Sequence, residues 1–411
     1  MLDVEFVRRQ FPALKQGWVL MDNAGGSVAP RQVIDRVTAY MRRYQVQLGA
    51  SYGLSVEAAA EVTAGRRAMA QWVGADAGEI VLGPSTTINL QLLAEALRPT
   101  LAPGDELIVT NLDHEANVGP WWRLAEALDL TVREWRIRAD AELDLADLDA
   151  LLNERTRLVC CTHCSNIAGR IVDIDAVTRR AHAAGARVCV DGVAFAPHRQ
   201  VDVRTLGVDI YAVSLYKTFG PHLGLLYVRR DLFETLASCN HFFVDPAKLA
   251  LKLEPGNVSY ELAAALPGIL DYFAALEGHH FPDALALDKG EGQVGLDRVF
   301  ALIAEHEEHL ANRLLGYLAS KPGVRVIGPA SGEQQIRVPT VSFVVEGRQS
   351  SEIPPYLDPR RIAVRWGHFY AYRPIRDLGL LARDGVVRVS LAHYNTTQEV
   401  DRLIEALDTV L

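Results

Sequence analysis

The chain has 411 residues, of which 49% are hydrophobic and 23% are charged, and its formal net charge at pH 7 is −9. A chain of this length is too long for one simple core, so we expect two domains. The acidic balance and the lack of any Lys/Arg-rich block argue against a nucleic-acid partner. The N-terminus has no apolar signal core and no segment is long enough to span a membrane, so we expect a cytoplasmic protein with no membrane partner.

The cysteines, at positions 160, 161, 164, 189 and 239, are an odd and sparse set that does not indicate a disulfide framework. Cys161 and Cys164 have the CxxC spacing of a redox site or of half a metal site. No second such pair follows, and "RLVCCT" is typical of a buried strand. We therefore expect small core residues and no metal.

From residue 79 onward, short β-branched runs alternate with amphipathic helical patterns. Helices are predicted from Thr87, from Ala116 and across 175–186. The predicted strands are 79–83, 105–110, 156–162, 187–192, 209–214 and 224–228. This alternation is typical of βαβ units, so it predicts an α/β fold with a mainly parallel sheet covered by helices on both faces.

Beyond about residue 265 the pattern changes. A polar, glycine-containing stretch at 285–295 leads into a long predicted helix at 296–320. Strands are then expected at 324–328, 340–345, 361–366 and 386–392, before a closing helix at 397–407. We expect a large domain over 20–265 and a small α+β domain that combines 1–19 with 266–411.

Polar side chains follow the predicted strands at the points where the strands end. They are Ser85, Thr86, His114, Asn166, Asp191 and Lys217. In sheets of this kind the chemistry collects at the carboxyl ends of the strands. A lone lysine is usually solvated, but Lys217 lies between the apolar runs "VDIYAV" and "LLYV". A desolvated amine there would have a lowered pKa suited to Schiff-base formation.

These residues match the needs of a pyridoxal 5'-phosphate (PLP) site, which are an amine, an acid for the pyridine nitrogen, a phosphate cradle and an aromatic ring face. Lys217 can supply the amine and Asp191 the acid, while His114 is the candidate ring stacker. The phosphate fits the helix start in "GPSTTINL", residues 83–90. Each residue alone has an ordinary alternative as a cap or a satisfied polar group, but their joint order at successive strand ends favours the cofactor site.

The sequence resembles the cysteine desulfurase and selenocysteine lyase branch of the class V aminotransferase family, and most of all its cysteine desulfurase-like subgroup. The resemblance is carried by "VLMDNAGGSVAPRQVID", "LDHEANVGPW", "THCSNIAGRIVDI", "VCVDGVAFAPH", "SLYKTFGPHLGLLY", "AVRWGHFYA" and "RVSLAHYNTTQEVDRL". It implies the PLP-dependent transferase fold of type I, in which a large domain with a mainly parallel seven-stranded sheet is joined to a smaller α+β C-terminal domain.

The same resemblance implies a role for each matching residue. Lys217 would carry the cofactor as a Schiff base, Asp191 would bind the pyridine nitrogen, His114 would stack on the ring, and Asn166 would contact the hydroxyl edge. The residues expected at the phosphate are Ser85, Thr86, Ser214 and Tyr216, with Tyr216 standing where the family often has histidine.

For the substrate, an amino acid, the resemblance implies that Arg388 clamps the carboxylate, a role that suits a bidentate guanidinium. Asn23, Arg365 and His368 lie in matching motifs and are also expected at the substrate. A homodimer with shared active sites is implied as well, in which Asn257 or Ser259 reaches the phosphate of the neighbouring subunit.

The chain departs from the family pattern at three places. Ala194 replaces the usual glutamine after the aspartate, and Asn257 and Ser259 stand where a threonine is usual. Desulfurases carry a nucleophilic cysteine after "RxGHH", whereas this chain reads "RWGHFYA" with Tyr370 at that position. A desulfurase needs that thiolate to accept sulfur, so the usual persulfide chemistry is not expected.

The remaining groups support a PLP-dependent C–S lyase that eliminates the β-substituent of a cysteine-derived substrate. Tyr370 would either donate a proton to the leaving group or fill the vacated space. An aminotransferase or an epimerase of the same family stays open, since both use the same carbanion, and a decarboxylating oxidative deaminase is a further route that related folds can support. A non-catalytic PLP-binding scaffold in sulfur trafficking is a further alternative, although a scaffold has no need for Arg388.

Overall fold

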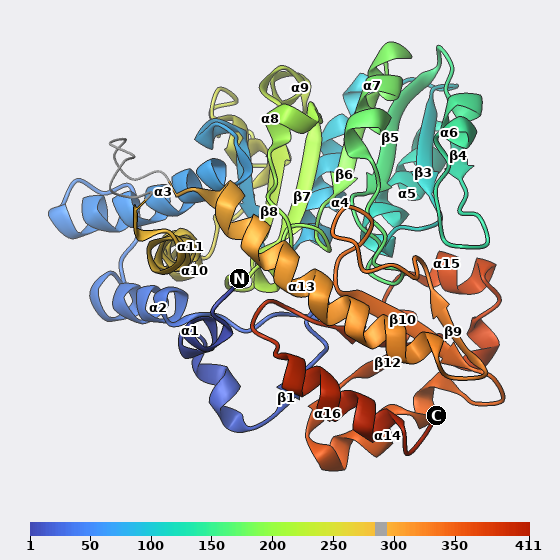
Figure 1. The fold of residues 1–411 in the computed structure, drawn as a ribbon. Coiled ribbons are helices and arrows are strands. Elements are labelled where there is room, and N and C mark those ends of the chain that lie inside the picture. The colour runs from blue at the N-terminus through green and yellow to red at the C-terminus, as the bar shows by residue number, and fades with distance from the viewer. Residues whose placement is uncertain (284–293) are drawn as a thin grey trace.

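The computed structural model describes residues 1–283 and 294–411. A large sheet with its covering helices forms the upper part of Figure 1, a smaller sheet forms the lower part, and the long helix α13 (Leu296–Ala319) runs across between them. Most of the polar stretch expected at 285–295 lies outside the described residues. Among the residues described, no helix is long and apolar enough to cross a membrane.

The large sheet has seven strands in the order β2-β8-β7-β6-β5-β3-β4. Its strands are β2 (Ile80–Gly83), β3 (Glu106–Thr110), β4 (Thr131–Trp135), β5 (Thr156–Thr162), β6 (Arg187–Asp191), β7 (Ile210–Ser214) and β8 (Gly224–Val228). β8 runs antiparallel to both of its neighbours, and the pairs from β7 through to β4 are parallel. The expected mainly parallel seven-stranded sheet is therefore confirmed.

Strand β4 was missed by the sequence analysis because it lies at the edge of the sheet. Its sequence "TVREW" has only Trp135 fully buried, whereas every residue of β3 and β7 is buried. An edge strand that is half exposed lacks the continuous apolar run by which central parallel strands are recognised.

Helices cover both faces of this sheet. The helices between the strands are α4 (Thr86–Leu97), α5 (Gly119–Leu128), α6 (Leu145–Leu151), α7 (Ile174–Ala183) and α8 (Val203–Leu206), and α9 (Arg230–Thr235) follows the last strand, β8. Residues of α4, α5 and α9 share one apolar cluster with one face of the sheet, and residues of α7 belong to a second cluster on the other face. The strands can be apolar along their whole length because neither face meets water.

The second cluster also includes four helices from distant parts of the chain. They are α2 (Arg31–Arg43), α3 (Gly53–Val73), α10 (Tyr260–Ala264) and α11 (Pro267–His280). A Cβ on Gly65 would lie 1.9 Å from the carbonyl oxygen of Ala263, so α3 and α10 cross in close contact. Helix α11 comes after residue 265 and still shares this core with the sheet. The domain boundary expected at residue 265 stays a prediction.

The small sheet has four antiparallel strands in the order β12-β13-β10-β9. Its strands are β9 (Val324–Ile327), β10 (Thr340–Val345), β12 (Arg365–Gly367) and β13 (Val386–Ser390). The helices of this part are α13, α14 (Pro354–Leu357), α15 (Tyr372–Asp377) and α16 (Thr397–Leu407). An α+β C-terminal part is thereby confirmed.

The single strand expected at 361–366 was wrong, because the chain changes partners at Val364. The short strand β11 (Ile362–Ala363) pairs in parallel with β1 (Val19–Leu20), and β12 pairs antiparallel with β13. The two halves thus belong to different sheets, and a continuous β-type pattern in the sequence carries no information about the partner of each residue.

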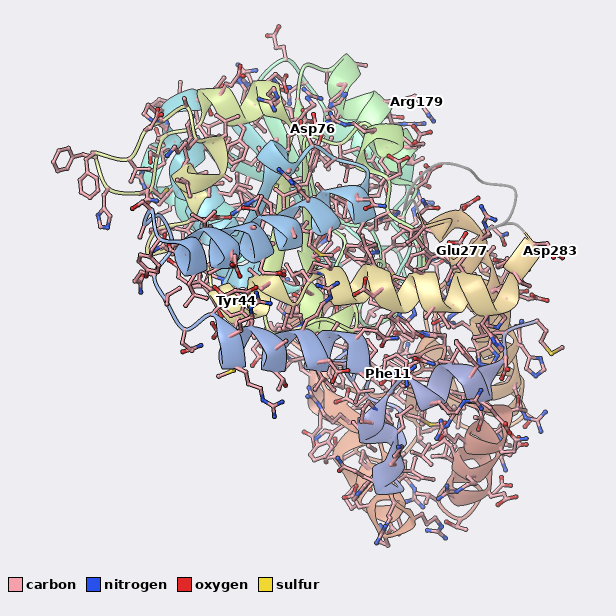
Figure 2. The ribbon with its side chains drawn as sticks, turned by 90° about the vertical axis from the view of Figure 1, so that its left-hand side faces the viewer. Phe11, Tyr44, Asp76, Arg179, Glu277 and Asp283 are labelled. Carbon is pink, nitrogen blue, oxygen red and sulfur yellow. The ribbon has the colours of Figure 1, made fainter. Side chains whose placement is uncertain are left out.

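The N-terminal segment, with helix α1 (Val4–Arg9), lies against the C-terminal half of the chain. The Asp3 amide donates a hydrogen bond to His280 Nε2 at 2.8 Å, and Arg8 pairs with Glu399 at 2.9 Å. Phe11, labelled in Figure 2, is fully buried and packs edge to face on Tyr272 and on Phe219. Since Phe219 follows Lys217 by two residues, this packing supports the loop that presents the lysine.

Candidate active site

A cavity of about 490 Å³ opens where β5, β6 and β7 end. Its walls include Ser85, Thr86, His114, Asn166, Asp191, Ser214, Tyr216 and Lys217. These are eight of the residues expected at the cofactor, and they come from five separate segments of the chain. The parallel strands bring them together because their carboxyl ends meet at one edge of the sheet.

Lys217 ends a single 3₁₀ turn, Leu215–Lys217, directly after β7. Burial is the main cause that lowers the pKa of its amine to about 8, and the charge of Arg388 lowers it further. Among residues 1–283 and 294–411, no hydrogen bond or ion pair to Nζ is found, and the amine lies 5.8 Å from the centre of the Tyr216 ring. The lysine is therefore an amine that loses its proton readily and faces a cavity.

Asp191 ends β6 and is 4% exposed. Burial raises the pKa of its carboxyl, while a hydrogen bond from the Val193 amide (2.9 Å to Oδ1) and the charge of Lys217 oppose this rise. A buried carboxylate is stabilised most by a cationic hydrogen-bond donor. A protonated pyridine nitrogen would be such a donor.

The N-terminus of α4 lies at one end of the cavity. Ser85 is its N-cap and accepts a hydrogen bond from the Ile88 amide at 3.2 Å, and Thr86 Oγ1 lies 2.8 Å from Ser214 Oγ. A Cβ on Gly224 would lie 2.5 Å from the carbonyl carbon of Ser85 and 2.6 Å from the Thr86 nitrogen. Only glycine at the start of β8 therefore permits this helix start, whose free N–H groups and dipole favour a phosphate.

His114 is a neutral imidazole at the entrance of the cavity. Its Nδ1 accepts a hydrogen bond from the Ala116 amide at 3.1 Å, which makes His114 the cap of the 3₁₀ turn Glu115–Asn117. Burial, followed by the charges of Lys217 and Arg388, lowers its pKa to about 4. An uncharged ring held in this way is suited to lie on an aromatic cofactor rather than to act as an acid at neutral pH.

Arg388 comes from β13 of the small sheet and is 1% exposed. Its Nη2 donates to Asp22 Oδ1 at 2.9 Å and its Nη1 donates to the Asn166 carbonyl at 3.2 Å. Nε is buried and has no partner among the described residues. Burial lowers the pKa of the guanidinium to about 10, so it stays charged at neutral pH, and the residue lines the cavity, where a cation suits an anionic group.

The segment after β12 forms the outer wall. Phe369 lies beneath the Arg388 guanidinium, with 3.7 Å between Cζ and the ring centre, and its carbonyl accepts a hydrogen bond from Asn166 Nδ2 at 3.0 Å. Tyr370 is 68% exposed, and its ring centre lies 5.4 Å from that of His114. Both residues have positive φ values, 49° and 60°. The exposed tyrosine thus stands at the mouth of a cavity that Lys217 also lines.

A second, wider cavity adjoins the first, and Lys217 and Arg388 both line it. Arg365 also lines this wider cavity and pairs with Asp22 Oδ2 at 3.3 Å. His368 is exposed, and its Nδ1 accepts a hydrogen bond from the Tyr370 amide at 3.1 Å, so this histidine shapes the turn and is not part of the cavity wall.

Besides His368, Asn257 and Ser259 also lie away from the cavity, whereas Asn23 lines a small adjoining hollow together with Lys217 and Ala194. The side-chain amide nitrogen of Asn23 donates hydrogen bonds to the carbonyl oxygens of Leu20 and Ser390, at 3.0 and 2.9 Å. Its side-chain oxygen accepts a hydrogen bond from the Tyr394 hydroxyl. Asn257 is exposed with φ 69°, and Ser259 is the N-cap residue of α10. The roles expected for all the site residues stay predictions.

All the cysteines are free thiols, and only Cys239 is partly exposed. Cys164 is part of the cavity wall, but burial raises the pKa of its thiol to about 12. Its Sγ lies 3.2 Å from the Gly169 carbonyl oxygen. A thiol with such a pKa is not the thiolate that sulfur transfer requires.

Several residues of the site were missed by the sequence analysis. Asp22 links Arg388 to Arg365, Phe369 supports Arg388, and Gln91, Glu115 and Arg123 line the wider cavity. Asp22 and Phe369 lie within motifs that were recognised, so their neighbourhood was a usable signal. Gln91 and Arg123 lie on the polar faces of helices and have no local signature.

Comparisons with known proteins agree with this geometry. The model of the family "Aminotransferase class-V" matches residues 19–241 and 297–403. The chain is 43% identical to the aminotransferase-like protein FGM3 of Gibberella zeae, over 99% of this chain and 98% of that protein. It is 35% identical to the cysteine desulfurase-like protein ustD of Aspergillus flavus, over 100% of this chain and 91% of that protein.

Among solved structures, the apo structure of a cysteine desulfurase from Thermococcus onnurineus NA1 has a TM-score of 0.87 at 25% identity, covering 100% of this chain and 98% of that chain. The family model matches most of the sequence, and the amine, the buried carboxyl and the helix N-terminus of the cavity fit PLP. The protein is therefore a PLP-dependent enzyme that belongs to the class-V aminotransferase family, in its cysteine desulfurase-like branch.

Proposed function

We propose that this enzyme is a C–S lyase that eliminates the β-substituent of a cysteine-derived amino acid. One observation carries the proposal: Lys217, Arg388 and Tyr370 line the same cavity, and Tyr370 stands where a desulfurase presents a thiol. The similarity to a cysteine desulfurase and to a cysteine desulfurase-like protein supports the sulfur-containing substrate.

When bound, PLP supplies an electron-withdrawing ring that stabilises negative charge at Cα. We propose that Lys217 carries it as a Schiff base, that Asp191 holds its ring nitrogen, and that His114 and Asn166 contact its ring face and hydroxyl edge. The phosphate would be held by Ser85, Thr86, Ser214 and Tyr216.

Arg388 and Lys217 have different roles toward the substrate: Arg388 binds it and Lys217 removes a proton from it. Arg388, whose guanidinium is charged and which lines the cavity, binds the α-carboxylate and thereby turns the Cα–H bond toward the amine of Lys217. A pKa of about 8, against the usual 10.5, leaves about a tenth of this amine unprotonated at pH 7 and more at higher pH, so Lys217 can take the Cα proton.

The proposed elimination balances in atoms and electrons. The Cα–H and Cβ–S bonds break, the sulfur leaves with the electron pair of the latter, and a proton converts the thiolate to a thiol. Water hydrolyses the remaining three-carbon fragment to pyruvate and ammonia. Sulfur leaves for solution because Tyr370 cannot accept it and the thiol of Cys164 is held protonated.

The test is an assay of cysteine conjugates for pyruvate, free thiol and enzyme-bound persulfide together. Equal amounts of pyruvate and thiol are expected, and Lys217→Ala abolishes both. Tyr370→Phe slows turnover by about 10²–10⁴-fold if the hydroxyl donates the proton, and leaves it unchanged if the ring only fills space. Stoichiometric persulfide, or amino transfer to a keto acid without pyruvate, would refute the proposal.

We also propose a homodimer with shared active sites. Ser259 Oγ is buried within its own subunit, so the exposed Asn257 is the better candidate to reach a neighbouring phosphate. Exposed apolar side chains, including Tyr52, Val56 and the fully exposed Phe242, offer surface for such an interface. Sedimentation at micromolar concentration is expected to show dimers, and a stable, fully active monomer would contradict this.

The free thiols support the cytoplasm as the location, because disulfides are rare there. Subcellular fractionation of the source cells tests this, and recovery of the protein outside the cytoplasmic fraction would contradict it.

A further inference from the structure

The space in front of Lys217 extends well beyond what the cofactor needs. An open cavity of about 1120 Å³, counted together with its solvent-filled mouth, includes Lys217 and Arg388 at its inner end and continues between α4 and α5, where Gln91, Pro120 and Arg123 line it. These same three residues also line a further hollow of about 690 Å³ between the two helices. We call this stretch, defined by Gln91, Pro120 and Arg123, the outer groove.

The cations along this space differ in what they bind. Arg388 and Arg365 share Asp22, at 2.9 and 3.3 Å, and Arg388 is assigned to the α-carboxylate. His114 is neutral at physiological pH because its pKa is lowered to about 4. Arg123 makes no hydrogen bond or ion pair within residues 1–283 and 294–411, so its charge is available in the outer groove.

One carboxylate lies close to Arg123. A Cβ on Gly119 would stand 3.1 Å from Arg123 Nη1 and 3.2 Å from Glu115 Oε1, so both side chains approach this glycine, but no ion pair between them is found among the described residues. Glu115 is already paired through Oε2 with Arg373 at 3.3 Å. Glu115 is thus held by Arg373, which also pairs with Glu134, and Arg123 is left as a cation of the outer groove without a carboxylate partner among the described residues.

We propose that the substrate of this enzyme carries a second anionic group at the far end of its β-substituent, and that Arg123, assisted by the amide of Gln91, binds that group. This inference rests on the proposed function and names its substrate class: an S-substituted cysteine with a carboxylate or similar anion on the substituent. Arg388 selects one end of the molecule and Arg123 the other. Arg123 is a specificity residue, since the reaction at Cα does not need it.

The test compares conjugates of similar size but different charge: S-(2-carboxyethyl)-, S-(2-carbamoylethyl)- and S-(3-aminopropyl)-L-cysteine. With the holoenzyme, kcat/KM for the carboxylate is expected to exceed that for the neutral amide about 5- to 30-fold, in line with a partly exposed charged hydrogen bond. The amine is expected to be the poorest of the three.

Arg123→Gln is expected to remove most of this preference and to leave kcat/KM for the neutral conjugate within about twofold. The matched control is Arg98→Gln, because Arg98 lines the neighbouring hollow but is paired with Glu95 at 3.1 Å. That control should retain the preference. Calorimetric Kd values of the same conjugates give a readout that does not depend on turnover.

Equal kcat/KM and Kd values for the carboxylate and amide conjugates would overturn the inference. So would an equal loss for all conjugates in Arg123→Gln, or a change in its sedimentation, since either shows a structural role. If no conjugate yields pyruvate, the proposed function fails, and the Kd series still decides whether Arg123 selects the anion.

Discussion

The ammonium form of Lys217 is disfavoured by burial and by the charge of Arg388, and its pKa is lowered from 10.5 to about 8. Only the unprotonated amine attacks an aldehyde, so we expect the rate of PLP attachment to the cofactor-free protein to rise with pH and to be half-maximal near pH 8. Stopped-flow absorbance across pH 6–11 measures this. A midpoint near 10.5 would show that the amine is solvated.

The same shift has a consequence for stability. Between about pH 8 and 10.5 the unfolded chain keeps a proton on Lys217 that the folded chain has lost. The free energy of unfolding of the cofactor-free protein should therefore rise with pH in this window. Denaturant titrations of the protein and of Lys217→Met isolate the contribution, which should be absent from the variant.

Arg388 is expected to recognise the carboxylate by geometry as well as by charge. Arg388→Lys keeps a charge but loses the planar fork and the Nε donor, so kcat/KM for an amino-acid substrate should fall about 10²-fold. For the matching amine that lacks the carboxylate, the variant and the parent should be equally poor. An equal loss on both compounds would show that the substitution damages the site in general.

At the scale of elements, the start of α4 depends on its contact with β8. Gly224→Ala would place a methyl group 2.5 Å from the carbonyl carbon of Ser85 and so displace the helix start, at a cost of about 1–3 kcal/mol of stability. The displaced cradle should also weaken PLP binding, measured by equilibrium dialysis. Gly316→Ala is the control, because open space surrounds Gly316 within α13, and it should be neutral or stabilising.

At the scale of the whole molecule, α15 attaches the Tyr370 segment to the large sheet. Arg373 binds Glu115 at 3.3 Å and Glu134 at 3.1 Å, and Asp377 accepts from Asn111 at 2.7 Å. The wall of the cavity thus depends on ion pairs between segments far apart in the sequence.

Arg373→Met should therefore raise KM about 3- to 10-fold and speed hydrogen exchange at residues 368–372, with little loss of overall stability. Arg376→Met is the control on the same helix, since Arg376 pairs with its neighbour Asp377. Unchanged exchange in Arg373→Met would show that Arg373 does not hold the segment.

Much of the fold and of the cofactor site could be predicted from the sequence. Central strands such as β7 are buried throughout, and the polar residues at or just after their ends, Asp191 and Lys217 among them, lie at one edge as expected. Both follow from local patterns, because strand burial and strand direction in βαβ units are readable along the chain. The edge strand β4 and the division of 361–366 between two sheets were not readable in this way.

Local sequence therefore accounts for the identity of the groups in this protein: an amine after β7, a carboxyl after β6, a helix start after β2, and a tyrosine in place of a thiol. Their partners depend on contacts between distant segments. Asp22 pairs with Arg388, and the Asn23 amide donates to the Ser390 carbonyl, although more than 300 residues separate the partners in each pair. The packing of α4 beside α5 leaves Arg123 facing the substrate space. Such pairings follow from three-dimensional packing, which no spacing along the chain encodes.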